Sequence, residues 1–300
     1  MRMIAKSTLT ACALLLALPA CVRDAPKRMA ANDADPALWV VKDRDTTVYL
    51  FGTIHVLKPG LTWFDEAVRA AFDRSGEVVL ELVMPEPAAM QALVAAKATT
   101  VDGPTLTEQL PAARRAAYAR AVTDMGMPAD ALDRMRPWFA ATTLSILPLG
   151  KLGYDAANGP ETIIADAAKA AGKPVSGLET PEQQIGYFAG LSQGAQVEFL
   201  TSTIDELPTL GTTMATMVDD WAHGKPEALA RQMNDSLKDS PEVAKVLLTD
   251  RNARWAKWVK ARMARPGTVF VAVGAGHLAG ASSVIAMLAK DGVKVTRVAY

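Results

Sequence analysis

Cysteine and net charge are both scarce in this chain of 300 residues. There are two cysteines, and both lie within the first 21 positions, so no disulfide framework is expected. Lysine plus arginine and aspartate plus glutamate number 32 each, and this balance lacks the positive excess that nucleic-acid binding requires. We therefore expect no nucleic-acid partner.

The common catalytic motifs are missing as well. The sequence contains no His-Glu-x-x-His, no Gly-x-Ser-x-Gly, no glycine-rich phosphate loop with lysine and no cysteine pair for a metal. Any metal ligands must therefore be dispersed along the chain. Hydrophobic residues make up 50% of the chain and charged residues 21%, which is enough apolar material for a sizeable core and excludes a disordered or fibrous protein.

The first 20 residues have the pattern of a secretory signal peptide. Arg2 and Lys6 precede an apolar run, Ala11–Leu18, which is too short to cross a bilayer as a stop-transfer helix. The next four positions, Leu18-Pro19-Ala20-Cys21, resemble the bacterial lipobox, in which the cysteine becomes the acylated first residue. The alternative is an ordinary signal cleavage with Cys21 as a bystander.

These features divide the chain into three parts: a signal peptide over 1–20, a lipidated tether over 21–36 and a folded domain over 37–300. Lipidation at Cys21 implies a periplasmic protein whose membrane contact is its lipid anchor. By analogy with lipoprotein sorting, the lack of aspartate after Cys21 favours the outer membrane.

The domain alternates strand and helix patterns, which predicts the α/β class. A hairpin is expected over Leu38–Val41 and Thr46–Phe51, and a helix and the strand Glu77–Val83 follow it as a β–α–β unit with a parallel strand pair. The middle is helical, with one helix predicted over Ala129–Leu147. Val175–Leu178 and Thr268–Val273 read as buried strands.

Two of the three histidines share one sequence context. His55 and His277 each stand three residues after a glycine that follows a predicted strand, whereas His223 has the pattern of a structural residue at a helix end. Glycine lets the backbone turn sharply at the carboxyl end of a strand, where α/β sheets bind ligands. A duplicated half of the fold and a functional pairing of the two ends both explain the match.

Acidic residues occupy similar places in the sequence. Glu81 lies near the end of a predicted strand and Glu179 directly follows another. Two imidazoles and one or two carboxylates from several strand ends fit a divalent metal with an open position for water. The alternatives are a structural role for each histidine, a solvent-facing edge position for Glu81 and a helix-start role for Glu179.

Several short motifs, in this order, resemble the TraB/GumN family, whose relatives include the Tiki metalloproteases. The resemblance extends over about 37–300. The motifs that carry it are Leu38-Trp39, YLFGTIHV at 49–56, Glu81, Gly153-Tyr154-Asp155, GLETPEQQ at 177–184, Asp250-Arg251-Asn252 and GAGHLAG at 274–280.

The resemblance implies an α/β fold with a central mixed sheet, many helices, two pseudo-symmetric halves and one site between them. It further implies a divalent-metal-dependent hydrolase that cleaves a peptide or protein substrate with Mn, Co, Zn or Fe as the metal. The implied residues are His55, Glu81 and His277 at the metal, Glu81, Glu179 and Arg251 in catalysis, and Tyr154, Asp155 and Asn252 at the substrate.

Other functions within this family stay open at the level of sequence. A lipoprotein that binds haem, a metal or a peptide without chemistry would use the same histidines. An accessory protein of polysaccharide machinery would need neither of them for catalysis. The sequence does not identify the metal, the substrate or the oligomeric state.

Overall fold

The computed structural model describes residues 32–237 and 240–300, so the predicted signal peptide and Cys21 lie outside the described residues. The strands are β1 (Leu38–Lys42), β2 (Thr46–Thr53), β3 (Glu77–Leu82), β4 (Val175–Glu179), β5 (Gly267–Gly274) and β6 (Val295–Arg297). The α-helices are α1 (Glu66–Arg74), α2 (Pro87–Ala98), α3 (Leu106–Gln109), α4 (Ala112–Asp124), α5 (Pro137–Lys151), α6 (Pro160–Ala170), α7 (Pro181–Ala189), α8 (Gln193–Glu206), α9 (Leu210–Ala222), α10 (Pro226–Leu237), α11 (Pro241–Ala244), α12 (Asp250–Arg262) and α13 (Val284–Lys290).

The strands form one six-stranded mixed sheet in the order β4-β3-β5-β2-β1-β6. Strands β4, β3, β5 and β2 are parallel to one another, whereas β1 pairs antiparallel with both β2 and β6. The expected hairpin and the mixed α/β class are confirmed. Strands β2 and β3 are parallel, as predicted, but β5 lies between them. The two pseudo-symmetric halves are not confirmed.

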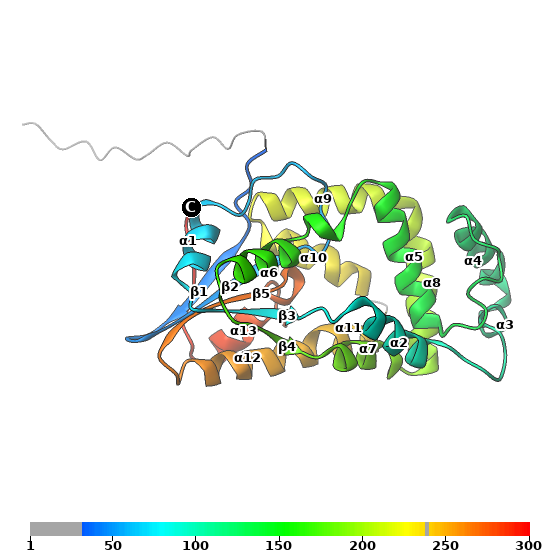
Figure 1. The fold of residues 1–300 in the computed structure, drawn as a ribbon. Coiled ribbons are helices and arrows are strands. Elements are labelled where there is room, and N and C mark those ends of the chain that lie inside the picture. The colour runs from blue at the N-terminus through cyan, green and yellow to red at the C-terminus, as the bar shows by residue number, and fades with distance from the viewer. Residues whose placement is uncertain (1–31, 238–239) are drawn as a thin grey trace, which may run out of the picture. The chain divides into compact units, whose positions relative to one another are not determined.

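Helices cover both faces of the sheet (Figure 1), and the alternation of side chains along β5 shows how. Phe270 and Ala272 pack into a core cluster shared with α1, α6 and α9, whereas Val269, Val271 and Val273 pack into a second cluster shared with α12 and α13. Successive side chains of a strand point to opposite faces, so a strand buried on both sides reads as a continuous apolar run. The apolar run Thr268–Val273, which predicted a buried strand, thus forms β5, a central strand of the sheet.

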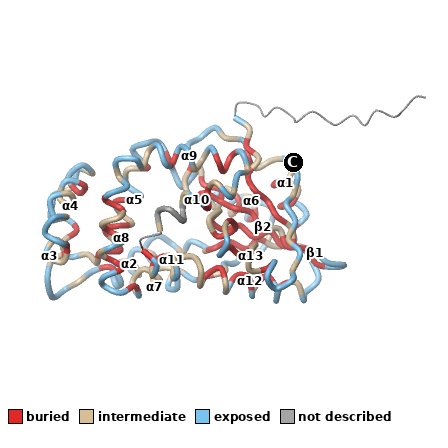
Figure 2. The backbone as a smooth tube through the Cα atoms, turned by 180° about the vertical axis from the view of Figure 1, so that it is seen from behind, coloured by how far each residue is buried: buried red, intermediate tan, exposed pale blue. Residues whose placement is uncertain are grey.

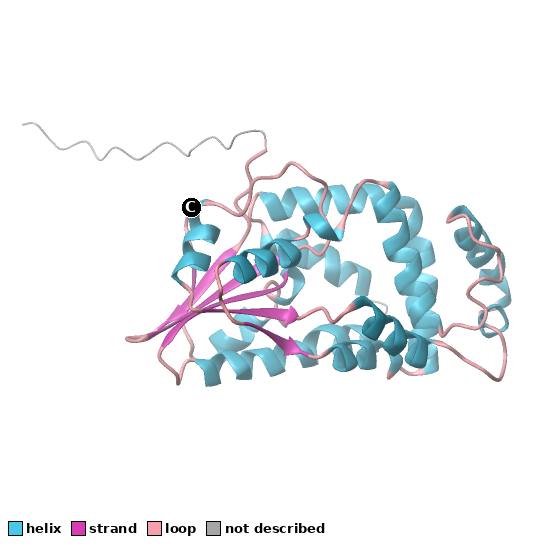
Figure 3. Ribbon diagram, viewed as in Figure 1, coloured by secondary structure: helices cyan, strands magenta, loops and turns pink. Residues whose placement is uncertain are grey.

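A further layer of helices lies beyond the carboxyl ends of the strands. In Figure 3 the arrowheads of β3 and β4 point toward α2, α7 and α11, and α5 and α8 stand beyond these. Helices α4, α5 and α8 share a core cluster of their own, built around Tyr118, Leu144 and Leu200. Figure 2 shows these buried segments as separate from those of the sheet. The polar site described below lies where the strands end and these helices begin.

Two local predictions need correction. The helix expected over Ala129–Leu147 begins only at Pro137, because Arg136 adopts an extended conformation (φ −69°, ψ 149°) before the proline ring. The strand expected to be buried at Val175–Leu178 is β4, an edge strand in which Ser176 and Gly177 are exposed. Its short apolar sequence does not distinguish an edge strand from a central one.

Residues 32–36, which the sequence assigns to the tether, contact the domain. The Ala34 N–H donates to the Thr62 carbonyl at 2.9 Å, the Asp35 N–H donates to the Ala222 carbonyl at 2.7 Å, and Ala34 is fully buried. Among the described residues, no helix combines the length and apolar character needed to cross a membrane.

Candidate functional site

Four adjacent parallel strands bring polar side chains to one edge of the sheet. Glu81 lies one residue before the end of β3 and Glu179 is the last residue of β4. Thr53 and Gly274 are paired at the ends of β2 and β5, so His55 and His277, which follow them closely, come to the same edge. The structure therefore places these four residues at the carboxyl ends of parallel strands, as the sequence predicted. The residues that form hydrogen bonds with them come mainly from the helices.

Arg251, near the start of α12, contacts Glu81, Glu179 and His277, and these four residues are called the polar cluster below. Its Nε donates to Glu179 Oε1 and Oε2 at 2.9 and 3.1 Å, and its Nη2 donates to Glu179 Oε2 at 2.7 Å and also to Glu81 Oε1. Arg251, Glu81 and Glu179 are each less than a tenth exposed. A carboxylate buried to this degree needs a charged partner, and one guanidinium serves both.

The surroundings hold the Arg251 side chain in place. Its Nη1 donates to the Leu247 carbonyl at 3.1 Å, and this carbonyl belongs to a π-helical turn, η3 (Lys245–Thr249), that directly precedes α12. The guanidinium carbon lies 4.9 Å from the centre of the Trp255 ring and 5.5 Å from that of Tyr187. Rings at these distances favour a cation over their faces.

Both carboxylate oxygens of Glu81 accept hydrogen bonds. Besides Arg251, Oε1 accepts from Gln184 Nε2 at 2.9 Å, and Oε2 accepts from the Gly274 N–H at 3.2 Å. Burial raises the pKa of Glu81, but His277, Arg251 and His55 oppose this effect and lower the pKa to about 2. Glu81 is therefore ionised at neutral pH.

His277 is held in one orientation by Asn252, the neighbour of Arg251 on α12. Asn252 Nδ2 donates to the Ser282 carbonyl at 2.8 Å, which leaves its Oδ1 to accept from His277 Nδ1 at 2.6 Å. The lone pair of Nε2 then faces Arg251 Nη1 at 3.3 Å. Burial and the nearby positive charge of Arg251 lower the pKa of His277 to about 3, so the ring is neutral.

His55 has the opposite environment. Its Nδ1 lies 2.6 Å from Glu161 Oε1, and Thr53 Oγ1 donates to the same oxygen at 2.5 Å. Desolvation lowers the pKa of His55, but the hydrogen bond and negative charge of Glu161 outweigh it and raise the pKa to about 9. The His55 side chain is 68% exposed, so solvent reaches the ring and weakens the pairing.

Sequence reasoning missed Glu161. It lies in the first turn of α6, where an acidic residue after Pro160 reads as an ordinary helix-start carboxylate. The position of α6 depends on a close approach of two backbones, because a Cβ on Gly159 would lie 2.3 Å from the His55 carbonyl oxygen. A glycine directly before Pro160-Glu161 was the available signal.

The three predicted substrate residues lie around the cluster rather than in it. Tyr154 packs in a core cluster, with Lys58 Nζ 4.8 Å from its ring centre. The Asp155 carboxylate accepts from the Ala157 N–H at 2.8 Å and caps a short helical turn. Asn252 contacts His277, as described above. The structure thus brings only Asn252 into contact with the predicted metal and catalytic residues.

The residues predicted to bind a metal face a common point without forming a ligand shell. A Cβ on Gly274 would lie 3.5 Å from both Glu81 Oε2 and His277 Cδ2, and 3.7 Å from His55 Cε1. Among the side chains that the structure describes, however, no three or more of His, Cys, Asp or Glu are placed to hold a metal ion. Glu81 and His277 contact Arg251 instead, so in this arrangement they do not fit a metal, and the divalent metal stays a prediction.

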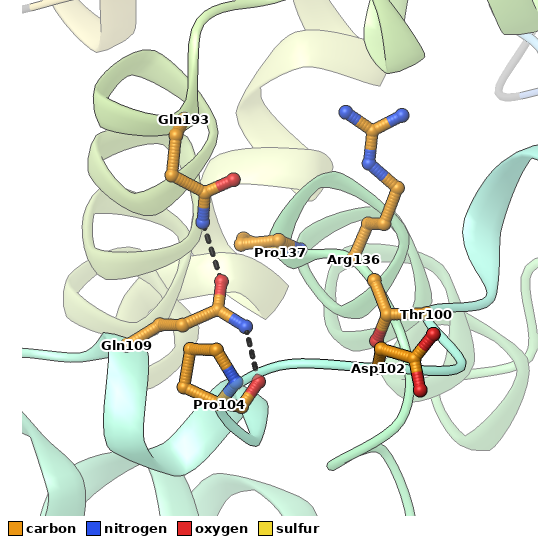
Figure 4. A pocket seen from close by; sticks show the side chains of 7 residues that line it. All are labelled: Thr100, Asp102, Pro104, Gln109, Arg136, Pro137 and Gln193. Atoms are coloured by element: carbon orange, nitrogen blue, oxygen red, sulfur yellow. Dashed lines mark hydrogen bonds between the residues drawn. The ribbon is translucent and has the colours of Figure 1, made fainter.

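A small cavity of about 270 Å³ lies elsewhere in the domain (Figure 4). It is lined by Thr100, Asp102, Pro104, Gln109, Arg136, Pro137 and Gln193. Gln193 donates to Gln109, which in turn donates to the Pro104 carbonyl at 2.9 Å. None of these residues belongs to the polar cluster around Arg251.

Comparison with known proteins identifies relatives of this chain. A sequence model of the TraB/PrgY/gumN family matches residues 37–297. The chain is 30% identical over 169 residues to the uncharacterized protein YbaP of Escherichia coli strain K12, and equally to that of Shigella flexneri. Each match covers 55% of this chain and 61% of the relative, so the chain spans about three fifths of the length of these curated relatives. No solved structure matches the chain.

Proposed function

The chain belongs to the TraB/PrgY/gumN family, and we propose that it is a hydrolase whose reaction takes place at the polar cluster around Arg251. The observation that carries this proposal is the contrast between two histidines at one sheet edge. Glu161 contacts Nδ1 of His55, whereas an amide oxygen and a guanidinium contact His277. Groups of one type held in opposite protonation states at one site are typical of acid–base catalysis.

The contacts suggest a role for each residue. His55 is open to solvent and paired with Glu161, which favours its protonated form, so it is placed to donate a proton to a leaving group. Glu81 stays ionised and His277 neutral, so Glu81 places a negative charge at the site that can accept a hydrogen bond from the attacking water. Arg251 keeps a fixed positive charge beside them, which would stabilise a carbonyl oxygen as it becomes negative.

In the proposed reaction, the oxygen of a water molecule bonds to the carbonyl carbon of a peptide, and the π electrons of the carbonyl pass to its oxygen beside Arg251. The carbon–nitrogen bond then breaks, the departing nitrogen takes a proton from His55, and His55 regains a proton from the attacking water. Glu179 acts through Arg251, and Asn252 and Glu161 act through the histidines. The peptide bond is the substrate that the resemblance to the Tiki proteases implies.

A peptide-cleavage assay tests this function. Residues 22–300, which include every described residue, would be incubated with a library of fluorescence-quenched peptides, with and without chelator and with Mn, Co, Zn or Fe added. We expect cleavage that is lost in His55→Ala and His277→Ala. His223→Ala is the matched control, because His223 lies at the end of α9, where its ring contacts Asp219. No cleavage of any peptide, or equal activity in all three variants, would contradict the proposal.

The proposal also includes the location of the protein. We propose that lipid attached to Cys21 holds the chain at the periplasmic face of the outer membrane. Incorporation of a labelled fatty acid that is lost in Cys21→Ala, together with fractionation of the two membranes, tests this point. Labelling that persists in the variant would contradict it.

A further inference from the structure

We propose that Arg251 is the resident cation of this site and takes the place that the sequence assigned to a divalent metal. The folded chain then does not take up a divalent metal through His55, Glu81 and His277. This inference concerns the charge that organises the site, and it is independent of which bond the site hydrolyses. Three sets of contacts carry it.

The first set concerns Glu81, the only carboxylate among the predicted ligands. Arg251 Nη2 and Gln184 Nε2 both donate to Oε1, and the Gly274 N–H donates to Oε2. The backbone donor is part of the β5 terminus and does not rotate away. A metal at Glu81 would also lie next to the guanidinium, and two cations in a buried site repel each other strongly.

The second set concerns His277. Its Nδ1 is occupied by Asn252, so Nε2 is the nitrogen left for a metal, and Arg251 Nη1 lies 3.3 Å from it. The same guanidinium thus contacts donor atoms of two of the three predicted ligands. Catalytic zinc sites use about three protein ligands. With Glu81 and His277 engaged, His55 alone does not make a site.

The third set explains why Arg251 stays where it is. Glu179 binds its Nε and Nη2 in a forked arrangement, the Leu247 carbonyl accepts from Nη1, and Trp255 lies against the guanidinium. A guanidinium held by a bidentate carboxylate and a ring is rigidly oriented. The π-helical turn η3 includes Leu247, and such turns are frequent at functional sites.

Elemental analysis of metal content tests the inference. The full chain, purified in detergent, would be equilibrated separately with Mn²⁺, Co²⁺, Zn²⁺ and Fe²⁺ and then desalted. We expect wild type to retain less than about a tenth of a metal ion per chain, and Arg251→Met to retain at least about five times more, because the substitution frees Glu81 and His277. Arg254→Met is the matched control, since Arg254 lies on the same helix with its side chain 49% exposed; it should behave as wild type.

The outcomes separate the possibilities. Near-stoichiometric metal in wild type that is lost in His277→Ala would overturn the inference. So would equally low metal in wild type and in Arg251→Met, because the three predicted ligands would then not form a metal site even without the arginine. Peptide cleavage does not enter either result, so the two proposals fail independently.

A second measurement on wild type covers the case in which Arg251→Met does not fold. The chain has three histidines, so a ¹H–¹⁵N spectrum of the imidazole rings shows His55, His223 and His277 separately once each is assigned by substitution. We expect the His277 signals to stay in place when one equivalent of Zn²⁺ is added. Joint movement of the His55 and His277 signals, with His223 unmoved, would overturn the inference.

Discussion

Replacing Arg251 by methionine tests the charge balance of the cluster through folding stability. The substitution keeps much of the side-chain volume but leaves Glu81 and Glu179 buried without their main cation. Removing one partner of a buried ion pair costs about 3–5 kcal/mol of unfolding free energy. Arg254, whose side chain is 49% exposed and lies 3.8 Å from Glu179, should cost less than about 1 kcal/mol when replaced by methionine.

The loss should depend on pH in a definite direction. In wild type the pKa of Glu81 is lowered to about 2, so its contribution is present above the unfolded value of 4.5 and is lost only as the pH falls toward 2. In Arg251→Met the burial that raises this pKa remains, the guanidinium that helps to lower it is gone, and the charges of His277 and His55 stay. The pKa of Glu81 should therefore lie above its wild-type value, and the stability gap between the variant and wild type should narrow as the pH is lowered from about 7 to about 4.

Urea denaturation of wild type, Arg251→Met and Arg254→Met at both pH values measures these differences. The expected loss is compatible with folding, because domains typically have about 5–15 kcal/mol of stability. Equal losses in the two variants at neutral pH would refute the assignment of Arg251 as the main partner of both carboxylates. A gap that widens on acidification would refute the predicted effect on Glu81.

Three further predictions follow from single contacts. Gly274→Ala should leave the urea midpoint nearly unchanged, because the new methyl group meets its neighbours at 3.5 Å or more. The same methyl group should abolish peptide cleavage, because it fills the point that Glu81, His277 and His55 face. Retained cleavage would contradict the proposal that the reaction takes place there. Lys173→Met should lose about 2–3 kcal/mol, since Lys173 donates to three carbonyls around the end of α1, whereas the exposed Lys169→Met should lose little in the same urea assay. Glu161→Gln should lower the pKa of His55 from its raised value toward 6.5 in an NMR titration, and an unchanged value would rule out Glu161 as the cause.

The sequence by itself determined the elements that depend on local pattern. The apolar run Thr268–Val273 predicted a strand buried on both faces, and β5 is such a strand. The two Gly-x-x-His segments predicted that His55 and His277 follow strand ends, and parallel strands present their carboxyl ends at one edge. These predictions held because strand periodicity and glycine turns are properties of a few consecutive residues.

Only the tertiary structure decided which charges meet. Arg251 and Glu81 are 170 positions apart, and no local pattern indicates that one guanidinium lies between two strand-end carboxylates and a histidine. Glu161 likewise reads as a helix-start residue until the fold brings α6 against His55. Such pairings depend on strand order and helix placement, which arise from the burial of the whole core rather than from any short segment. The protonation states of the two histidines follow from those pairings, because burial and neighbouring charges set them.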